Sequence, residues 1–311
     1  MQIYLPIAEV VVNAFLLFGI GGVVGLLSGM FGVGGGFLIT PALFFIGIPP
    51  SVAVSTGAVQ VVASSVSAVM VHLKRRTVDF RMGTVMLLSG FVGSTIGIYV
   101  FKELERLGHI NLFVEVCYTV LMGLIGTMMF QESLRAILRN RRAGKSGAPP
   151  RVIKRSHTKA QKWPLKVKFR TSGLYISILP PIMIGIVIGF LTTTLGVGGG
   201  FILVPAMIYL LGMNTKVVVG TSLYQVIFIS CYAVMAHVLT SQSVDLVLAV
   251  LLTLGGVIGA QFGAMIGLKL KAEQLRILLA ILVLLVGIKI FFGLVLEPAD
   301  LFNLDIPGHA Q

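Results

Sequence analysis

The 311-residue chain is poor in charged residues and in cysteine. Charged residues make up 11% of it, whereas soluble domains carry about a quarter, so the composition excludes an ordinary water-exposed fold. The two cysteines, Cys117 and Cys231, both lie inside apolar runs, which excludes a disulfide framework and a cysteine-based zinc cluster. The first ten residues contain no Lys or Arg, so we expect no cleavable signal peptide.

Motifs that carry chemistry are also missing from the apolar stretches. These stretches hold no carboxylate pair, no metal-binding cluster and no nucleophile with a neighbouring base. The chain has no ATP-binding P-loop either. We therefore expect neither an enzyme nor a bound cofactor or metal, and an ion gradient or the substrate's own gradient would have to drive any transport.

Hydrophobic residues are abundant, at 56% of the chain with a mean hydropathy of +0.99. Apolar runs bounded by turn or charge clusters predict ten helical segments, at about 8–30, 37–48, 52–73, 82–101, 110–130, 174–194, 201–212, 217–240, 246–268 and 277–296. Eight of them are long enough to cross a hydrocarbon core of about 30 Å. The other two, 37–48 and 201–212, would be only about 18 Å long, so we expect half-helices there. The prediction is an all-α membrane protein.

The formal net charge of +13 is concentrated in one segment. Residues 131–173 hold thirteen of the 24 Lys and Arg residues and one acidic residue, a net charge of +12. This segment resembles a nucleic-acid or anionic-lipid patch, but a cytoplasmic loop between spans is cationic in any case. Its residues 165–170 alternate apolar and cationic side chains, which predicts a short strand or an interfacial segment.

The chain repeats itself on either side of this basic segment. GVGGGF at 32–37 recurs at 196–201, an offset of 164 residues. Further matches follow in the same order: Pro41-Ala42 with Pro205-Ala206, AVMVH at 68–72 with AVMAH at 233–237, and Val78-Asp79 with Val244-Asp245. We therefore predict a first transmembrane repeat at 1–130, a basic cytoplasmic linker at 131–173, a second transmembrane repeat at 174–298 and a tail at 299–311.

The number of crossings in each half decides whether the halves are parallel or inverted. If the short segments complete a crossing, each half crosses five times and the repeats are inverted. If they merely dip into the membrane, each half crosses four times and the repeats are parallel. The inverted arrangement puts the basic turns at 74–81 and 269–276 on the cytoplasmic side, as the positive-inside rule requires. The charges thus favour two inverted homologous halves, each with four long spans and one short broken half-helix.

The glycine clusters predict a binding site. A helix that restarts after a break points its backbone N–H groups and its positive dipole end back at the break, and this attracts anions. Hydroxyl and amide side chains follow each short segment and could add neutral donors. The predicted substrate-binding residues are Gly34, Gly35, Gly36, Thr56, Gln60, Gly198, Gly199, Gly200, Thr221 and Gln225. The alternatives are close helix packing for the glycines, and N-capping with interhelical hydrogen bonds for the side chains.

Four ionisable residues within the spans allow two interpretations each. His72 and His237 end equivalent segments, where they either anchor the chain at the membrane interface or take part in proton coupling. Glu115 and Lys289 could form an intramembrane ion pair, or Glu115 could reach the interface.

The doubled GVGGGF motif with its following Pro-Ala, together with the VGTS segment at 219–222, resembles the sulfite exporter TauE/SafE family. The resemblance covers about 10–130 and 172–296. It implies a multi-pass permease of the bacterial inner membrane that moves small anions, often sulfite, sulfonates or other sulfur-containing anions. The expected partners are a small anionic substrate and the lipid bilayer, with a proton or sodium ion as candidate coupling ion and a homo-oligomer as candidate assembly, but no nucleic acid.

Two functional hypotheses follow. The first is a secondary transporter whose broken helices hold the anion, so that replacing Gly35 or Gly199 with Ala should damage transport more than replacing Gly93 or Gly259. The alternative is a non-transporting polytopic sensor or scaffold that acts through its basic linker.

Overall fold

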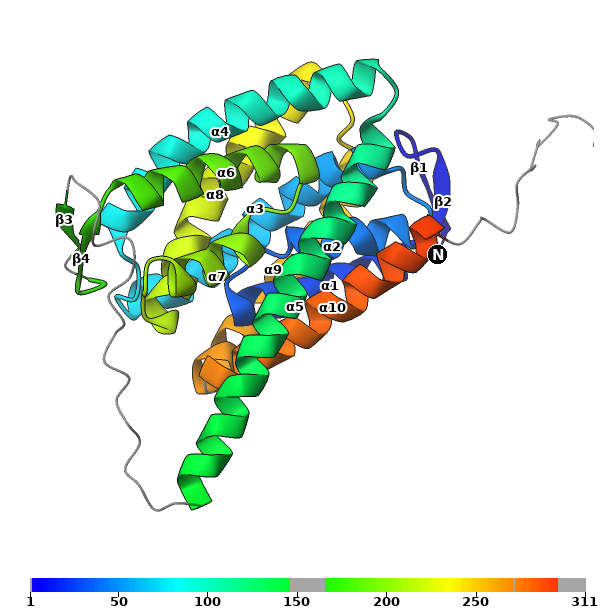
Figure 1. Cartoon of the computed structure of the whole chain (residues 1–311). Coiled ribbons are helices and arrows are strands. Elements are labelled where there is room, and N and C mark those ends of the chain that lie inside the picture. The colour runs from blue at the N-terminus through cyan, green and yellow to red at the C-terminus, as the bar shows by residue number, and fades with distance from the viewer. Residues whose placement is uncertain (1, 146–165, 170, 271, 296–311) are drawn as a thin grey trace, which may run out of the picture.

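The computed structural model describes residues 2–145, 166–169, 171–270 and 272–295. Within these ranges the chain forms ten helices and two antiparallel β-hairpins (Figure 1). The elements of the first half are β1 (Gln2–Leu5), β2 (Val10–Asn13), α1 (Ala14–Phe31), α2 (Gly36–Phe44), α3 (Pro50–Lys74), α4 (Phe80–Arg106) and α5 (Ile110–Lys145). Those of the second half are β3 (Lys166–Phe169), β4 (Leu174–Ser177), α6 (Leu179–Leu195), α7 (Gly200–Tyr209), α8 (Thr215–Thr240), α9 (Leu246–Lys269) and α10 (Ala272–Val295).

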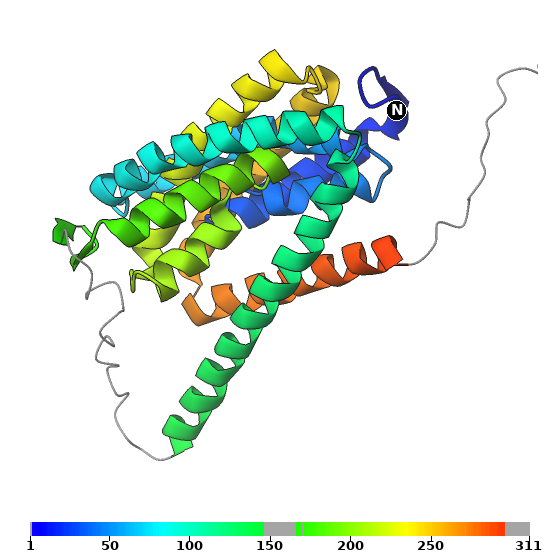
Figure 2. The same cartoon turned by 45° about the horizontal axis from the view of Figure 1, so that its top comes forward.

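Each half begins with a hairpin, which the expectation of purely helical halves missed. The expected helices at 8–30 and 174–194 therefore begin later, at Ala14 and Leu179. The side chain of Asn13 caps α1 by accepting the N–H of Phe15, and prolines occupy the first turn of α6, where no N–H is needed. The predicted strand within 165–170 is confirmed as β3. The two hairpins lie at opposite ends of the helix bundle (Figures 1 and 2).

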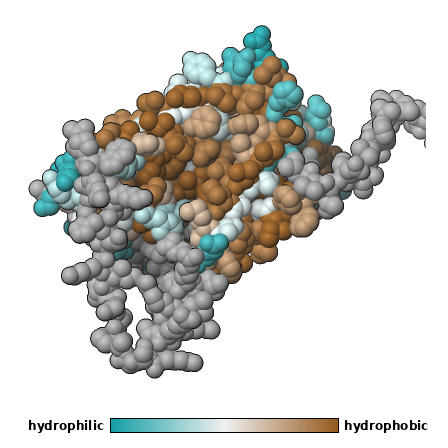
Figure 3. All heavy atoms as spheres, viewed as in Figure 1, coloured by the Kyte–Doolittle hydropathy of each residue, from teal (hydrophilic) through white to brown (hydrophobic). Residues whose placement is uncertain are grey.

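Six helices in the described part of the chain are long and apolar enough to cross a membrane. They are α1, α3, α4, α5, α8 and α9. The other two expected long spans correspond to shorter apolar helices, at Leu179–Leu195 and in the described stretch Ile277–Gly293. The short helices α2 and α7 confirm the predicted half-helices. The face of the molecule in Figure 3 is largely hydrophobic, with hydrophilic residues gathered toward its ends.

Two pairs of helices from opposite halves pack backbone to backbone along rows of glycine. In the α1–α9 seam, Gly21 lies against Leu252, Gly25 against Gly256 and Gly29 against Ala260, so the two helices run parallel. In the α4–α6 seam, Gly185 lies against Met86, Gly189 against Gly90 and Gly97 against Phe190, again in parallel. Small residues allow this close approach.

Two further pairs of helices run antiparallel. Gly220 in the second turn of α8 lies against His72 at the end of α3. At the other end, the Ser55 hydroxyl near the start of α3 donates to the Ser243 carbonyl, just after α8, at 2.9 Å. In the α5–α10 pair, Gly126 packs on Leu284 and Gly287 packs on Met122, so residue numbers rise on one helix as they fall on the other. The α5 helix continues to Lys145, and residues 146–165 of the basic linker lie outside the described part.

Candidate functional site

The glycine clusters form two sharp turns, which we name the first break (residues 32–35) and the second break (residues 196–199). Gly32 ends α1 in the left-handed conformation at φ +70°, and Gly34 and Gly35 follow at φ +83° and +77°. The second break repeats this pattern at the positions shifted by 164, with φ of +65°, +70° and +67° at Gly196, Gly198 and Gly199. Glycine adopts such angles without the steric cost that a Cβ brings, so the repeated motif encodes the repeated break.

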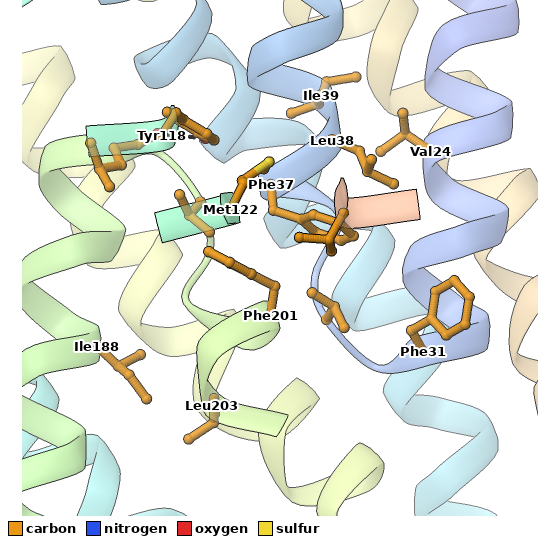
Figure 4. Packing of buried hydrophobic residues seen from close by; sticks show 14 of the residues in the cluster. Val24, Phe31, Phe37, Leu38, Ile39, Tyr118, Met122, Ile188, Phe201 and Leu203 are labelled. Atoms are coloured by element: carbon orange, nitrogen blue, oxygen red, sulfur yellow. Dashed lines mark hydrogen bonds between the residues drawn. The ribbon is translucent and has the colours of Figure 1, made fainter. Parts of the chain in front are cut away.

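The two breaks lie against each other at the centre of the molecule. Gly36 lies so close to the backbone of Gly196 and Val197 that a Cβ on it would overlap them, and Gly200 lies equally close to Val33. Phe37 and Phe201, the next residues, stack with ring centroids 5.6 Å apart (Figure 4). The structure therefore brings the predicted residues Gly34, Gly35 and Gly36 next to Gly198, Gly199 and Gly200, although 164 positions separate them in the sequence.

The short helices begin at these breaks without a capping side chain. Neither α2 nor α7 receives a side-chain hydrogen bond at its N-cap, which is Gly35 in one and Gly199 in the other. The first N–H groups of a helix have no partner within the helix and carry its positive dipole end. Two such ends, buried at the crossing of the breaks, form an arrangement that favours negative charge.

A buried tyrosine links the breaks to α5. The Tyr118 hydroxyl donates to the carbonyl of Leu195, the last residue of α6, at 2.9 Å, and lies 3.4 Å from the carbonyl of Gly36. Figure 4 shows Tyr118 on the same side of the crossing as Met122 of the same helix. The sequence analysis did not single out Tyr118, because a lone tyrosine in an apolar run carries no signal of its own.

The two predicted glutamines have different surroundings. Gln225 is buried and its Nε2 donates to the carbonyl of Met86 at 3.3 Å. Gln60 is fully buried, its amide lies against Gly256 of α9, and neither amide atom has a hydrogen-bond partner among the described residues. The neighbouring residue Val61, rather than Gln60, contacts both Gly34 and Gly198. Because an unpaired buried amide is costly, Gln60 is suited to a polar ligand or water between α3 and α9.

The two predicted threonines bond to backbone instead. Thr56 Oγ1 accepts the N–H of Asp245 at 3.0 Å, and Thr221 Oγ1 accepts the N–H of Asp79 at 3.0 Å. Thr221 also donates to the carbonyl of Val217 at 2.7 Å. Both hydroxyls therefore help to hold the start of the helix that crosses beside them.

Asp79 and Asp245 are a pair that the sequence analysis recorded as a repeat match but did not interpret. Both are buried and both cap a helix: Asp79 accepts the N–H of Met82, and Asp245 accepts those of Val247 and Leu248. Each also binds the turn of a hairpin, since Asp79 accepts from the backbone and hydroxyl of Ser172, and Asp245 from the N–H of Ile7. The recurring Val-Asp before an apolar run is an N-cap signal that could have revealed them.

The other ionisable candidates lie apart from the breaks. His72 and His237 are both buried, so neither is an exposed interfacial anchor: His72 Nδ1 lies 3.1 Å from Thr77 Oγ1, and His237 Nε2 lies 3.0 Å from the Thr193 carbonyl. Glu115 and Lys289 form no ion pair in the described part of the chain, and the Lys289 ammonium lies 3.8 Å from the ring centroid of Phe45. Of the two interpretations of these residues, the intramembrane ion pair is therefore not formed.

Comparisons with known proteins agree on one family. The family model described as sulfite exporter TauE/SafE matches residues 17–290. The chain is 26% identical over 281 residues to the probable membrane transporter protein YunE of Bacillus subtilis (strain 168), which covers 88% of this chain and 95% of that protein. It is 27% identical over 262 residues to a probable membrane transporter protein of Xylella fastidiosa (strain 9a5c), covering 82% of this chain and 85% of that protein.

A shorter match reaches a plant protein. The chain is 34% identical over 91 residues to sulfite exporter TauE/SafE family protein 1 of Arabidopsis thaliana, covering 29% of this chain and 20% of that protein. No solved structure matches the chain.

Proposed function

Because the chain belongs to the sulfite exporter TauE/SafE family of membrane transporters, we propose that it is a secondary transporter of a small anion, namely sulfite, a sulfonate or another sulfur-containing anion. The observation that carries this proposal is the pair of uncapped helix N-termini at the two buried breaks. The proposed location is the bacterial inner membrane, with a proton or sodium ion as coupling ion and a homo-oligomer as assembly.

The chemistry of the breaks suits an oxyanion that must be bound and released. An oxyanion of sulfur offers several acceptor oxygens, and backbone N–H groups of Gly35, Gly36, Gly199 and Gly200 are donors that carry no full charge. An arginine or lysine would bind the anion more strongly, at the expense of release. Gln60 supplies a further buried and unpaired amide on α3, where it lies against Gly256 of α9.

The remaining predicted side chains already have partners. Thr221 and Gln225 donate to backbone carbonyls, with which the anion would compete. Thr56 and Thr221 also accept the N–H groups of two aspartates and so hold the starts of α9 and α4. We therefore assign the direct contacts to the six glycines and Gln60, and a positioning role to Thr56, Thr221 and Gln225.

An inverted relation between the halves is supported by the direction of the equivalent helices. The element order makes α3 equivalent to α8 and α5 equivalent to α10. Equivalent helices in contact would run parallel around an axis along the membrane normal and antiparallel around an axis in the membrane plane. Both pairs run antiparallel, as the contacts of Gly220 with His72 and of Gly287 with Met122 indicate. Each half would then contribute four long helices and one short broken helix.

Flux into vesicles reconstituted with the full chain tests the proposed function. Sulfite, thiosulfate, sulfoacetate, taurine and sulfate would be compared, each with and without imposed pH and sodium gradients. We expect uptake of at least one of the sulfur oxyanions above that of protein-free vesicles. Absence of flux for every anion under every gradient would overturn the proposal.

A variant without residues 146–160 separates transport from the alternative of a scaffold that acts through its linker. These residues follow the described end of α5, so the helices around the breaks stay intact. We expect the transport rate to stay within about twofold of the full chain. The scaffold would be favoured if neither the full chain nor the variant transports any anion and the variant alone loses binding to a partner.

The Gln60→Leu variant tests the amide directly. Leucine is close to glutamine in volume and removes an unpaired polar group from a buried position, so the variant should be at least as stable as the parent. We nevertheless expect its transport of the identified anion to fall about tenfold or more. Transport equal to that of the parent would show that the Gln60 amide does not contact the anion.

A further inference from the structure

The two breaks share one backbone conformation but differ in the side chains beside them. At the first break, Ser28 of α1 lies against Gly35, with its hydroxyl oxygen 3.4 Å from the position that a Cβ on Gly35 would occupy. Ser65 of α3 lies against Gly34 in the same way, at 3.5 Å. Both serines are fully buried, and neither hydroxyl has a hydrogen-bond partner among the residues that the structure describes.

The second break has no equivalent free hydroxyl at the position of Ser28. At the offset of 164, Thr192 replaces Ser28 and Ile188 replaces Val24. The Thr192 hydroxyl donates to the Ile188 carbonyl at 2.8 Å, within its own helix. The larger side chains also crowd the turn, because a Cβ on Gly199 would meet both Ile188 and Thr192 more closely than one on Gly35 would meet Val24 and Ser28.

Unsatisfied donors in an apolar interior are costly unless a ligand or water completes them. A serine in a helix normally donates to a carbonyl one turn back, as Thr192 does. Two serines from different helices both lack such a bond, and they lie against consecutive glycines of the same turn, Gly35 and Gly34, which points to a common polar occupant. The start of α2 supplies the positive dipole end at that point, so the occupant is expected to be an anion.

We propose that the transported oxyanion binds asymmetrically, at the first break, where the hydroxyls of Ser28 and Ser65 donate to its oxygens together with the backbone N–H groups that begin α2. This proposal rests on the proposed transport function and specifies the position of its site. The second break then supports the first through backbone packing, because the Thr192 hydroxyl, the counterpart of Ser28, is already bonded, and no atom of Ser230, the counterpart of Ser65, is among the three nearest to a Cβ on Gly198. An oxyanion with several oxygens satisfies both hydroxyls and the backbone donors at once, whereas a halide offers no separate acceptor atoms.

Two matched pairs of variants of the full chain test the proposal. Ser28→Ala is compared with Thr192→Val, its equivalent in the second half, and Ser65→Ala with Ser230→Ala, which is equivalent at an offset of 165. Ser230 is also buried without a partner, so the two alanine variants remove the same kind of group. The readouts are the KM for sulfite in reconstituted vesicles and the thermal stabilisation of the detergent-solubilised protein by sulfite over an equal ionic strength of sodium chloride.

We expect Ser28→Ala and Ser65→Ala each to raise the KM for sulfite about tenfold or more, as for the loss of a hydrogen bond to a charged group. They should also abolish most of the sulfite-specific stabilisation, while the unliganded protein melts as before. Thr192→Val and Ser230→Ala should stay within about twofold of the parent. Equal effects in the two members of each pair would overturn the asymmetric site while leaving transport intact. A parent protein that transports no anion of the panel under any gradient, and that none of them stabilises, would overturn both proposals.

Discussion

The glycines of the two seams and those of the two breaks look alike in the sequence but differ in backbone conformation and in the space around them. In the seams, Gly25 and Gly189 are ordinary helical residues that face the backbone of another helix, where a Cβ would overlap a carbonyl oxygen. At the first break, Gly34 and Gly35 have positive φ, and the nearest atom to a Cβ on Gly35 is 3.1 Å away. A seam glycine is required for space and Gly35 for its conformation, whereas Gly32 and Gly196 are required for both.

This difference separates stability from function. Excess volume at a seam pushes two long helices apart along their whole contact, so its cost falls on the fold. A Cβ at a break strains one residue by about 1–2 kcal/mol but moves the backbone donors that we assign to the anion. The structure thus changes the expectation that Gly35→Ala is more damaging than Gly93→Ala, because a Cβ on Gly93 would overlap the carbonyl of Ile186.

The largest effect is expected from a seam substitution. Gly93→Ala forces a methyl group into the backbone of α6, and we expect a loss of about 3 kcal/mol or more of stability, or failure to fold. Thermal unfolding and size-exclusion chromatography of the detergent-solubilised protein measure this. Gly259→Ala should behave alike in the α1–α9 seam, where the Gly22 carbonyl is in the way.

A matched control separates space from helix propensity. Gly19 also lies within a helix but has no atom within 4 Å of an added Cβ. Gly19→Ala should therefore melt at or slightly above the parent temperature, since alanine is the better helix former. If Gly93→Ala is as stable as Gly19→Ala, close packing does not determine the seams.

A smaller loss of stability is expected at the break, where the variant still folds and loses transport specifically. Gly35→Ala should cost about 1–2 kcal/mol because φ is +77°. Gly47, in the turn after α2, has φ of +84° and no atom within 4 Å of an added Cβ, so Gly47→Ala carries the same strain without touching the break. Both variants should melt a few degrees below the parent.

Vesicle flux distinguishes these two variants. We expect Gly35→Ala to transport the identified anion at least tenfold more slowly than Gly47→Ala, since one anion hydrogen bond is worth about that factor. Similar rates in the two would show that the break glycines only permit the turn and do not orient donors for the anion.

Several parts of this arrangement could be predicted from the sequence, because they depend on local conformation or on composition. GVGGGF predicted a helix break, and the recurrence of the motif predicted a second one. The apolar runs predicted ten helices, eight of them as long spans, and six helices in the described part of the chain are long and apolar enough to span a membrane. The Pro-Pro at the start of α6 is a short-range signal for the later start of that helix, but the sequence prediction did not use it.

Contacts across the repeat could not be predicted in the same way. Nothing in the sequence near Thr56 indicates that it bonds Asp245, because the partner is 189 residues away. The sequence also does not indicate that the hydroxyls of Ser28 and Ser65 lack a partner among the described residues, since a serine in a helix ordinarily bonds its own backbone. Periodicity therefore predicts which elements exist, while the partner of each polar group depends on how the two halves cross.

The smallest effect is expected from Tyr118→Phe, which tests whether the second break needs a side-chain hydrogen bond to keep its conformation. The variant keeps the buried ring and removes the hydrogen bond to the Leu195 carbonyl, so we expect a loss of about 1 kcal/mol. Tyr99→Phe is the control, because Tyr99 is 71% exposed on α4, and it should melt as the parent does. If glycine conformation alone fixes the second break, Tyr118→Phe will transport the anion within about threefold of the parent, below the factor for one hydrogen bond. A transport defect as large as that of Gly35→Ala would instead mean that the break keeps its shape only while Tyr118 holds the end of α6.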